Sequence, residues 1–204
     1  KDSRPTLVLN REGFGGYDPS AQPTNFINPS EEDIKEEQKE LSPDAQKVLN
    51  LIEYLCRECE NVQTLLERLL KLLITDGPFV RAALLMLTEH RKTAEIHTAV
   101  GEGFVEEEEI RVKDPLSPLA LCLTKIKSFN AKTIEDLISP FGISSYAVSP
   151  VKIRSDAPIV LYADCGLNQP LPMEARRIFR LVVGLLNQTL PRLPGGLPKK
   201  SVKE

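Results

Sequence analysis

The stretch VRAALLMLTEHRKTAEIHTAV, residues 80–100, decides the fold because it predicts two neighbouring strands joined by a tight turn. Val80 to Thr88 is almost wholly apolar, which is typical of a strand covered on both faces. Glu89-His90-Arg91 then supplies polar turn residues, which favours a hairpin. The second half alternates, and the residues on one of its sides are Ala94, Ile96, Thr98 and Val100.

The rest of the chain adds helices around further strands. Polar turn residues at 154–156 separate two apolar segments, 144–153 and 158–163, which we expect to be strands. Brief extended pieces are expected near residues 110–112 and 128–130, with short helices from Ser117 and Thr133 and a longer helix over 171–190. This order predicts an α+β fold around a mostly antiparallel sheet.

A long helix is expected before the first strand. Ser42-Pro43-Asp44 is a strong helix start, and no glycine or proline follows until Gly77. Apolar residues then alternate at spacings of four and three over about four heptads, which is typical of a coiled-coil seam. The predicted seam residues are Val48, Ile52, Leu55, Cys59, Val62 and Leu66. We expect this seam to join two copies of the chain as a homodimer. Toward the end of the helix, Leu65, Leu70 and Leu72 widen the apolar face, so that part is expected to pack on the body of the domain.

Both ends of the chain are expected to be flexible. Residues 1–43 combine prolines, glycines and a Glu/Lys-rich run, which is typical of a linker. Residues 192–204 resemble a tail. The domain is therefore expected at 44–191, with its N-terminal helix at 44–75.

Length, charge and hydropathy narrow the class of protein. The 204 residues suffice for one compact domain with a core. A formal net charge of −3 argues against nucleic-acid binding. No apolar run is long enough to span a bilayer, so we expect a soluble cytoplasmic protein without a signal peptide.

Several segments resemble a GAF domain, the signal-sensing and dimerising module of bacterial signalling proteins. The resemblance covers about residues 62–190. Ala83–Thr88 is similar to the first core strand of that family, and Ala94–Gly101 to its second strand with the terminal glycine. Ser145–Val151 and Pro158–Asp164 resemble its last two strands. The resemblance implies the GAF-like α+β fold and a cytoplasmic regulatory module with an attached or associated output domain.

The resemblance also implies where a small molecule would bind. In that family the pocket lies between one face of the sheet and the short elements that cover it. The corresponding residues are Phe104, Leu119, Cys122, Phe129, Ile134, Leu137, Tyr146 and Val148. Because these side chains are mostly apolar, they could equally fill a core and leave no cavity.

The sequence gives no support for a bilin, a haem or a zinc ion. The residues that anchor a bilin or recognise a cyclic nucleotide in members of the family do not occur at the matching positions. Cys56 and Cys59 supply two zinc ligands where four are needed, and they lie well inside the predicted helix rather than at its N-terminus. Small buried side chains or a thiol redox sensor are both compatible with them. His90 and His97 are expected at the surface, and Glu106–Glu109 in a solvated loop.

No nucleophile with an identifiable base and no phosphate-binding loop emerges from the sequence. We therefore expect a non-catalytic regulatory module that dimerises through its terminal helices and responds to a small molecule. The alternatives are a ligand-free module for dimerisation or partner docking, and a thiol redox sensor.

Overall fold

A computed structural model describes residues 40–87, 93–104, 109–111, 127–130, 141, 145–154, 159–167 and 169–203. The expected linker therefore lies almost wholly outside the described residues, as do both short covering helices. Within the described part, no helix has the length and apolarity that a membrane crossing requires.

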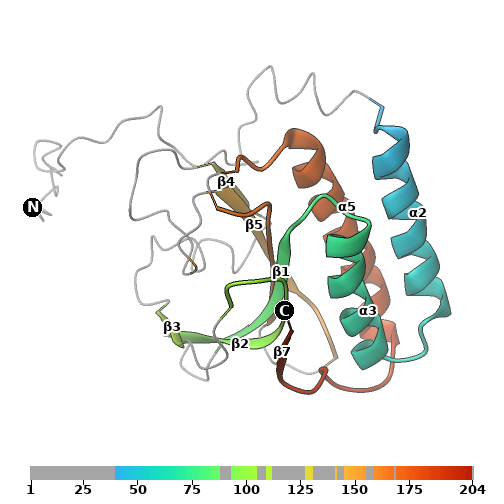
Figure 1. The fold of residues 1–204 in the computed structure, drawn as a ribbon. Coiled ribbons are helices and arrows are strands. Elements are labelled where there is room, and N and C mark those ends of the chain that lie inside the picture. Colours follow the sequence, from blue (N-terminus) through green and yellow to red (C-terminus); the bar gives the residue numbers. More distant parts are fainter. Residues whose placement is uncertain are drawn as a thin grey trace, which may run out of the picture.

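The chain folds as an α+β structure in which one sheet carries helices on one face (Figure 1). The helices are α2 (Pro43–Glu58), α3 (Val62–Thr75) and α5 (Met173–Thr189). The strands are β1 (Arg81–Leu87), β2 (Thr93–Val100), β3 (Glu109–Arg111), β4 (Lys127–Asn130), β5 (Ser145–Val151), β6 (Ile159–Asp164) and β7 (Ser201–Lys203). These bounds confirm the predicted α+β order and the predicted hairpin over residues 80–100.

The sheet has the order β3-β2-β1-β6-β5-β4, and neighbouring strands along this path are antiparallel. The hairpin β1–β2 is extended on its other side by β6, which pairs Arg81 with Asp164. Strand β7 pairs with β2 in parallel and off this path.

The predicted single helix over 44–75 is wrong, because the chain forms two helices with a break at residues 59–61. Cys59 is already extended, with φ −75° and ψ 128°. Asn61 begins the next helix, and its side chain accepts a hydrogen bond of 2.8 Å from the Thr64 amide. An asparagine at this position favours a new helix start, so α3 can change direction and pack on the sheet.

The core lies between the helices and the sheet. Leucines at helical spacing give α3 an apolar face that is fully buried against the strands. Ser42 caps α2 and also binds the Glu174 carboxylate through its amide and its hydroxyl, at 2.8 and 3.0 Å. These two hydrogen bonds tie the start of α2 to the start of α5.

The opposite face of the sheet is buried as well. Ala82 and Leu84 face the helices, so the alternation of a strand turns Arg81, Ala83 and Leu85 to the other side. The side chains of this second layer are buried but lie outside the helix-side cluster. They include Ala83, Leu85, Ile96, Tyr146, Val148, Val160 and Tyr162.

The predicted flexible tail at 192–204 is wrong for its described residues. Residues 190–192 form a 3-10 turn, η3 (Leu190–Arg192), and the chain then crosses to β2, where Ser201, Val202 and Lys203 pair with Thr98, Ala99 and Val100. These backbone pairs lie about a hundred residues apart in sequence, which explains why local composition did not reveal them.

Candidate functional site

A buried ion pair lies on the sheet face opposite the helices. Arg81 at the start of β1 and Asp164 at the end of β6 are cross-strand partners. The Arg81 Nε donates to both carboxylate oxygens, at 3.1 and 3.0 Å, and its Nη2 lies 2.9 Å from Oδ2. The two side chains are 9% and 0% exposed, so this pair is shielded from water.

Two further donors satisfy the Asp164 carboxylate. The Tyr162 hydroxyl donates to Oδ2 at 2.7 Å, and the Gly166 amide donates to Oδ1 at 2.8 Å. A buried charge is stable only when it is paired and hydrogen-bonded, and Asp164 meets both conditions. The carboxylate therefore holds Arg81 in a fixed orientation.

The arginine is less completely satisfied than its partner. Among the contacts of the described residues, the buried Nη2 has no aligned hydrogen bond, although it lies close to the carboxylate. Native proteins leave few buried donors in this state. This nitrogen is enclosed by protein atoms, and the Asp164 carboxylate is its charge partner.

Aromatic rings surround the ion pair. The Arg81 guanidinium lies 5.3 Å from the centre of the Phe104 ring, within the range of a cation–π contact. Phe141 packs edge-on against both Phe104 and Tyr162, at 4.9 Å in each case. Tyr146 stacks on Tyr162 with ring centres 5.6 Å apart. The charged pair is thus enclosed by flat apolar surfaces.

The turn after β2 approaches Arg81 closely because it contains glycines. Gly101 and Gly103 have φ values of 109° and 81°, a region that favours glycine. A Cβ on Gly101 would lie 2.6 Å from the Val80 carbonyl oxygen, and one on Gly103 would lie 3.3 Å from Arg81 Nη1. Side chains at either position would push this turn away from the arginine.

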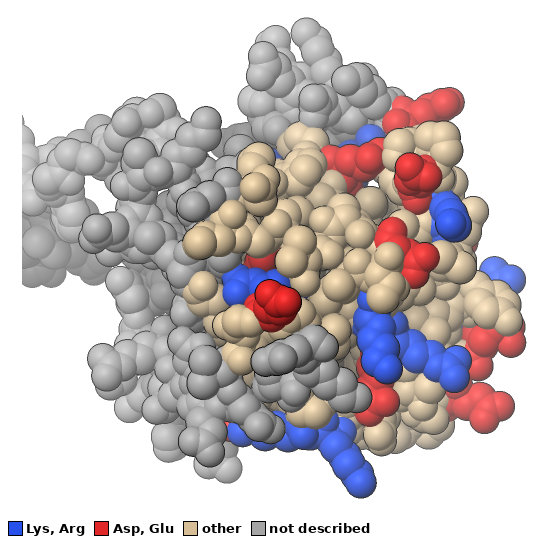
Figure 2. Space-filling model, in the orientation of Figure 1, with Lys and Arg blue, Asp and Glu red and all other residues tan. Residues whose placement is uncertain are grey.

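These elements line a pocket of about 740 Å³ that is open to solvent, which we call the Arg81 pocket. Its rim is partly apolar, since Val80 and Leu167 are 52% and 66% exposed. Its lining residues are Ile74, Val80, Arg81, Gly101, Glu102, Gly103, Phe141, Gly166 and Leu167. On the face drawn in Figure 2, acidic and basic side chains are interspersed over the described surface.

The structure brings together only part of the pocket expected from the sequence. Tyr146 and Val148 are fully buried on this face, and Phe104 lies beside Arg81. Phe129 belongs to β4 and pairs with Tyr146. The other four expected residues, Leu119, Cys122, Ile134 and Leu137, lie outside the described residues.

Sequence reasoning missed Arg81, Asp164 and the two glycines as site residues. The available signals were an arginine in an otherwise apolar strand and an aspartate at the end of another. A buried strand position is an unusual place for either charge unless the two are paired.

The predicted intermolecular seam is wrong, because its residues belong to the core of a single chain. Each of the six is at most 8% exposed and lies in the helix-side cluster; they are Val48, Ile52, Leu55, Cys59, Val62 and Leu66. Helix α2 packs on α5 and α3, and α3 packs on β1 and β2. The same spacing serves a helix packed on its own domain.

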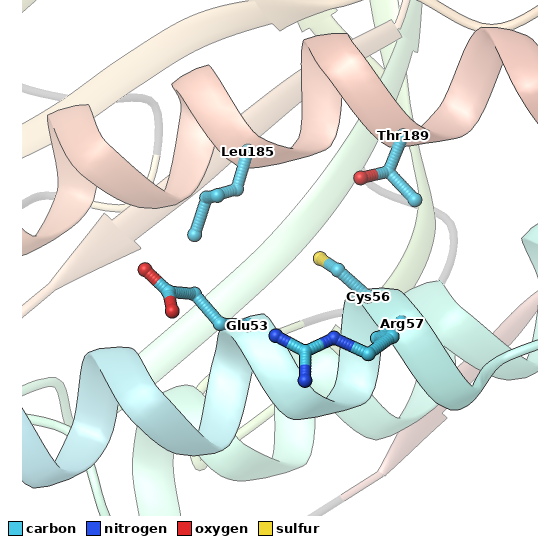
Figure 3. Close-up of a pocket in the computed structure, with 5 residues that line it drawn as sticks. All are labelled: Glu53, Cys56, Arg57, Leu185 and Thr189. Atoms are coloured by element: carbon cyan, nitrogen blue, oxygen red, sulfur yellow. The ribbon is translucent and has the colours of Figure 1, made fainter.

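Cys56 lies in a separate small pocket between α2 and α5 (Figure 3). This pocket has a volume of about 270 Å³ and is lined by Glu53, Cys56, Arg57, Leu185 and Thr189. Burial raises the pKa of the Cys56 thiol, and a hydrogen bond with Thr189 offsets part of that effect. Burial also raises the pKa of Cys59. Reactive thiols have lowered pKa values, so both shifts oppose a redox role.

The remaining candidate ligands do not gather into a metal site in the described segments, where no three His, Cys, Asp or Glu side chains are placed to hold an ion. His97 is half-buried, and its Nε2 lies 2.7 Å from the Pro198 carbonyl oxygen. His90, Cys122 and Glu106 to Glu108 lie outside the described residues.

Comparison with known proteins identifies the fold. No protein-family model and no curated protein matches the sequence. Among solved structures, the GAF domain of an Acinetobacter phosphoenolpyruvate-protein phosphotransferase is 14% identical, with a TM-score of 0.52 over 74% of this chain and 95% of that one. The A. aeolicus nlh2 GAF domain is 13% identical, with a TM-score of 0.55 over 74% and 97%. The chain therefore has a GAF-like fold.

A third similar structure corrects an expectation. The free methionine-R-sulfoxide reductase from Neisseria meningitidis, solved with its substrate, is 14% identical, with a TM-score of 0.55 over 72% of this chain and 90% of that one. We expected from the sequence that this chain is not an enzyme. As an inference from the fold, that expectation is wrong, because this reductase is an enzyme with a similar fold.

Proposed function

We propose that this chain is a regulatory domain that binds a small molecule in the Arg81 pocket and controls an associated output domain. The similarity to GAF domains of signalling proteins supports the regulatory part of this proposal. The described cysteines are unpaired thiols, which supports a reducing compartment such as the cytoplasm.

The observation that carries the proposal is the buried Arg81 held by Asp164 at the pocket. Its side chain lines the pocket, which is open and has a partly apolar rim. Such a site favours a ligand with an oxygen acceptor, such as a carboxylate, and an apolar body that can rest on Phe141 and Leu167.

A thermal-shift screen tests this proposal. Useful probes are benzoate, L-phenylalanine and L-methionine-R-sulfoxide, because each combines a carboxylate with an apolar group. A ligand that binds only the folded state raises the melting temperature. Leu167→Ala should weaken any hit severalfold, whereas Lys47→Ala, at an exposed position on α2, should leave it unchanged. A screen without any hit would favour the ligand-free docking module.

A second candidate function is reduction of a free amino-acid sulfoxide, which the similarity to the sulfoxide reductase favours. Reduction of a sulfoxide to a sulfide and water takes two electrons and two protons, which dithiothreitol supplies in an assay. Methionine formed from L-methionine-R-sulfoxide, measured by chromatography, tests this candidate. Cys165 directly precedes the pocket-lining Gly166, and Cys122 was expected in the pocket from the sequence, so Cys165→Ser and Cys122→Ser are the variants to compare.

Association of two copies also remains a proposal, although not through the predicted seam. Tyr54 on α2 and Leu181 on α5 are large exposed apolar side chains, at 61% and 44%. They are available to a second copy. Light scattering at high micromolar concentration tests this idea, with Tyr54→Ala and Leu181→Ala expected to shift any dimer toward monomer.

A further inference from the structure

The last described segment of the chain, residues 193–203, forms a strap between α3 and the outer edge of β2. The Pro194 carbonyl accepts a hydrogen bond of 3.0 Å from the Val62 amide, in the first turn of α3. Gly195 then turns the chain with a φ of 95°, close to Asn61. The strap is thereby attached at its beginning to the helix layer.

The second half of the strap is attached to β2. Pro198 is buried, and its carbonyl oxygen lies 2.7 Å from His97 Nε2. The Thr98 hydroxyl reaches the Lys199 carbonyl at 3.5 Å, and Lys200 forms an exposed ion pair with Glu95 at 3.4 Å. Strand β7 then pairs in parallel with the last three residues of β2.

The outer edge of β2 is divided between two partners. Strand β3 pairs with residues 93–95, and β7 pairs with residues 98–100. Because β7 has only three residues in parallel pairing, it is a short element of the kind that opens locally before the domain unfolds. Because β3 and β7 pair with separate parts of β2, opening of β7 need not break the β3 pairing.

The residues that β7 holds lead directly into the Arg81 pocket. Val100 pairs with Lys203 on one side and with Ala82 on the other. The next residue is Gly101, whose backbone packs against Val80 and Arg81, and Gly103 approaches the guanidinium. The end of β2 is thus continuous with one wall of the pocket.

We propose that the strap regulates the Arg81 pocket. With β7 paired, the end of β2 holds the turn at residues 101–103 against Arg81. With β7 released, this turn moves away from the guanidinium and the pocket changes shape. By linkage, a molecule that binds one of these pocket shapes must also change the attachment of the strap. The role of the strap in regulating ligand binding rests on the proposed function. The coupling between β7 and the turn at residues 101–103 does not.

Amide hydrogen exchange on the full chain tests the coupling without any ligand. Val202→Pro removes a backbone donor and disfavours strand pairing, and His97→Ala removes the contact with Pro198. Lys200→Ala is the matched control, because it removes only an exposed ion pair.

Both strap variants should speed exchange about tenfold at residues 98–100 and also at Gly101 and Gly103. Exchange at Ala147 and Ala163, within the β5–β6 pairing, should not change. The control should leave all these amides as in the wild type. If Val202→Pro prevents folding, His97→Ala still gives the measurement.

Faster exchange at residues 98–100 with unchanged Gly101 and Gly103 would overturn the proposal. Unchanged exchange throughout β7 in both variants would also overturn it, because pairing with β2 would then not hold the strap. If the coupling is found but no compound binds, the proposed ligand function fails while the coupling stands.

Discussion

Arg81 and Asp164 face each other across β1 and β6, 83 positions apart in sequence, and form a buried ion pair with Nη2 and Oδ2 2.9 Å apart. Removing one partner of such a pair leaves the other charge buried and alone. Asp164→Ala should therefore lower the free energy of unfolding by about 3–5 kcal/mol, measured by urea denaturation.

Glu95 and Lys200 provide the comparison for this prediction. Their side chains are 47% and 48% exposed, and exposed pairs contribute about 0–1 kcal/mol. Glu95→Ala should therefore have little effect on unfolding. Equal losses in Asp164→Ala and Glu95→Ala would show that the Arg81 pair is not buried as described.

Two glycines should respond to alanine in opposite directions. Gly184 is exposed within α5, and a Cβ there would meet no atom within 4 Å. Gly184→Ala should therefore stabilise the protein by about 0.5–1 kcal/mol. Gly101→Ala should destabilise it, because the new Cβ would lie 2.6 Å from the Val80 carbonyl oxygen at a positive φ. Thermal unfolding of both variants checks the signs, and a destabilising Gly184→Ala would contradict the position of that residue in α5.

The break between α2 and α3 depends on Asn61. Loss of an N-cap side chain costs about 1 kcal/mol, so Asn61→Ala should reduce stability by that amount and Asn61→Asp should restore it. Urea denaturation measures both variants. If residues 43–75 formed one continuous helix instead, alanine would be the better helix former and Asn61→Ala would stabilise the chain.

Cys165 should be a slow nucleophile at neutral pH. Burial, aided by the neighbouring Asp164 charge, raises the pKa of its thiol from 9.0 to about 11. Its Sγ also donates to the Pro78 carbonyl at 3.3 Å. Alkylation by iodoacetamide, followed by mass spectrometry, should therefore be slower at Cys165 than in an unfolded peptide until the pH approaches 11.

The same shift has a consequence for stability. Because the folded-state pKa is raised, the contribution of Cys165 is fully present below about pH 9 and is lost as the pH rises through about 11. Cys165→Ser should remove this part of the alkaline dependence of urea unfolding. Rapid alkylation of Cys165 at pH 7 would contradict the raised pKa of this half-buried thiol and would favour a catalytic role.

Local patterns in the sequence predict much of the fold. The apolar run before residue 88, the alternation after it and the helix at 171–190 each gave elements that the structure confirms. The helix break was missed because the apolar spacing of four and three runs through it without interruption. Asn61 was the polar residue that indicated a new helix start, but the apolar spacing favoured one continuous helix.

The candidate site and the strap could not be predicted in the same way. Arg81 and Asp164 become partners only through the pairing of β1 with β6, and β7 reaches β2 only after the chain has passed α5. Such contacts depend on tertiary arrangement rather than on local spacing. In the sequence, these contacts are indicated by a few charged residues and glycines at the ends of strands.

Nuclear magnetic resonance of the ¹⁵N-labelled chain tests the claim that the Arg81 pocket binds a small molecule. The Arg81 Nε–H, held by Asp164, and the amides of Gly101, Gly103 and Gly166 report on the pocket from three sides. During titration with benzoate, L-phenylalanine or L-methionine-R-sulfoxide, at least one compound should shift all four signals with a common saturation curve. If no compound shifts any of them, or if a bound compound shifts signals elsewhere and leaves these four unchanged, the claim is contradicted.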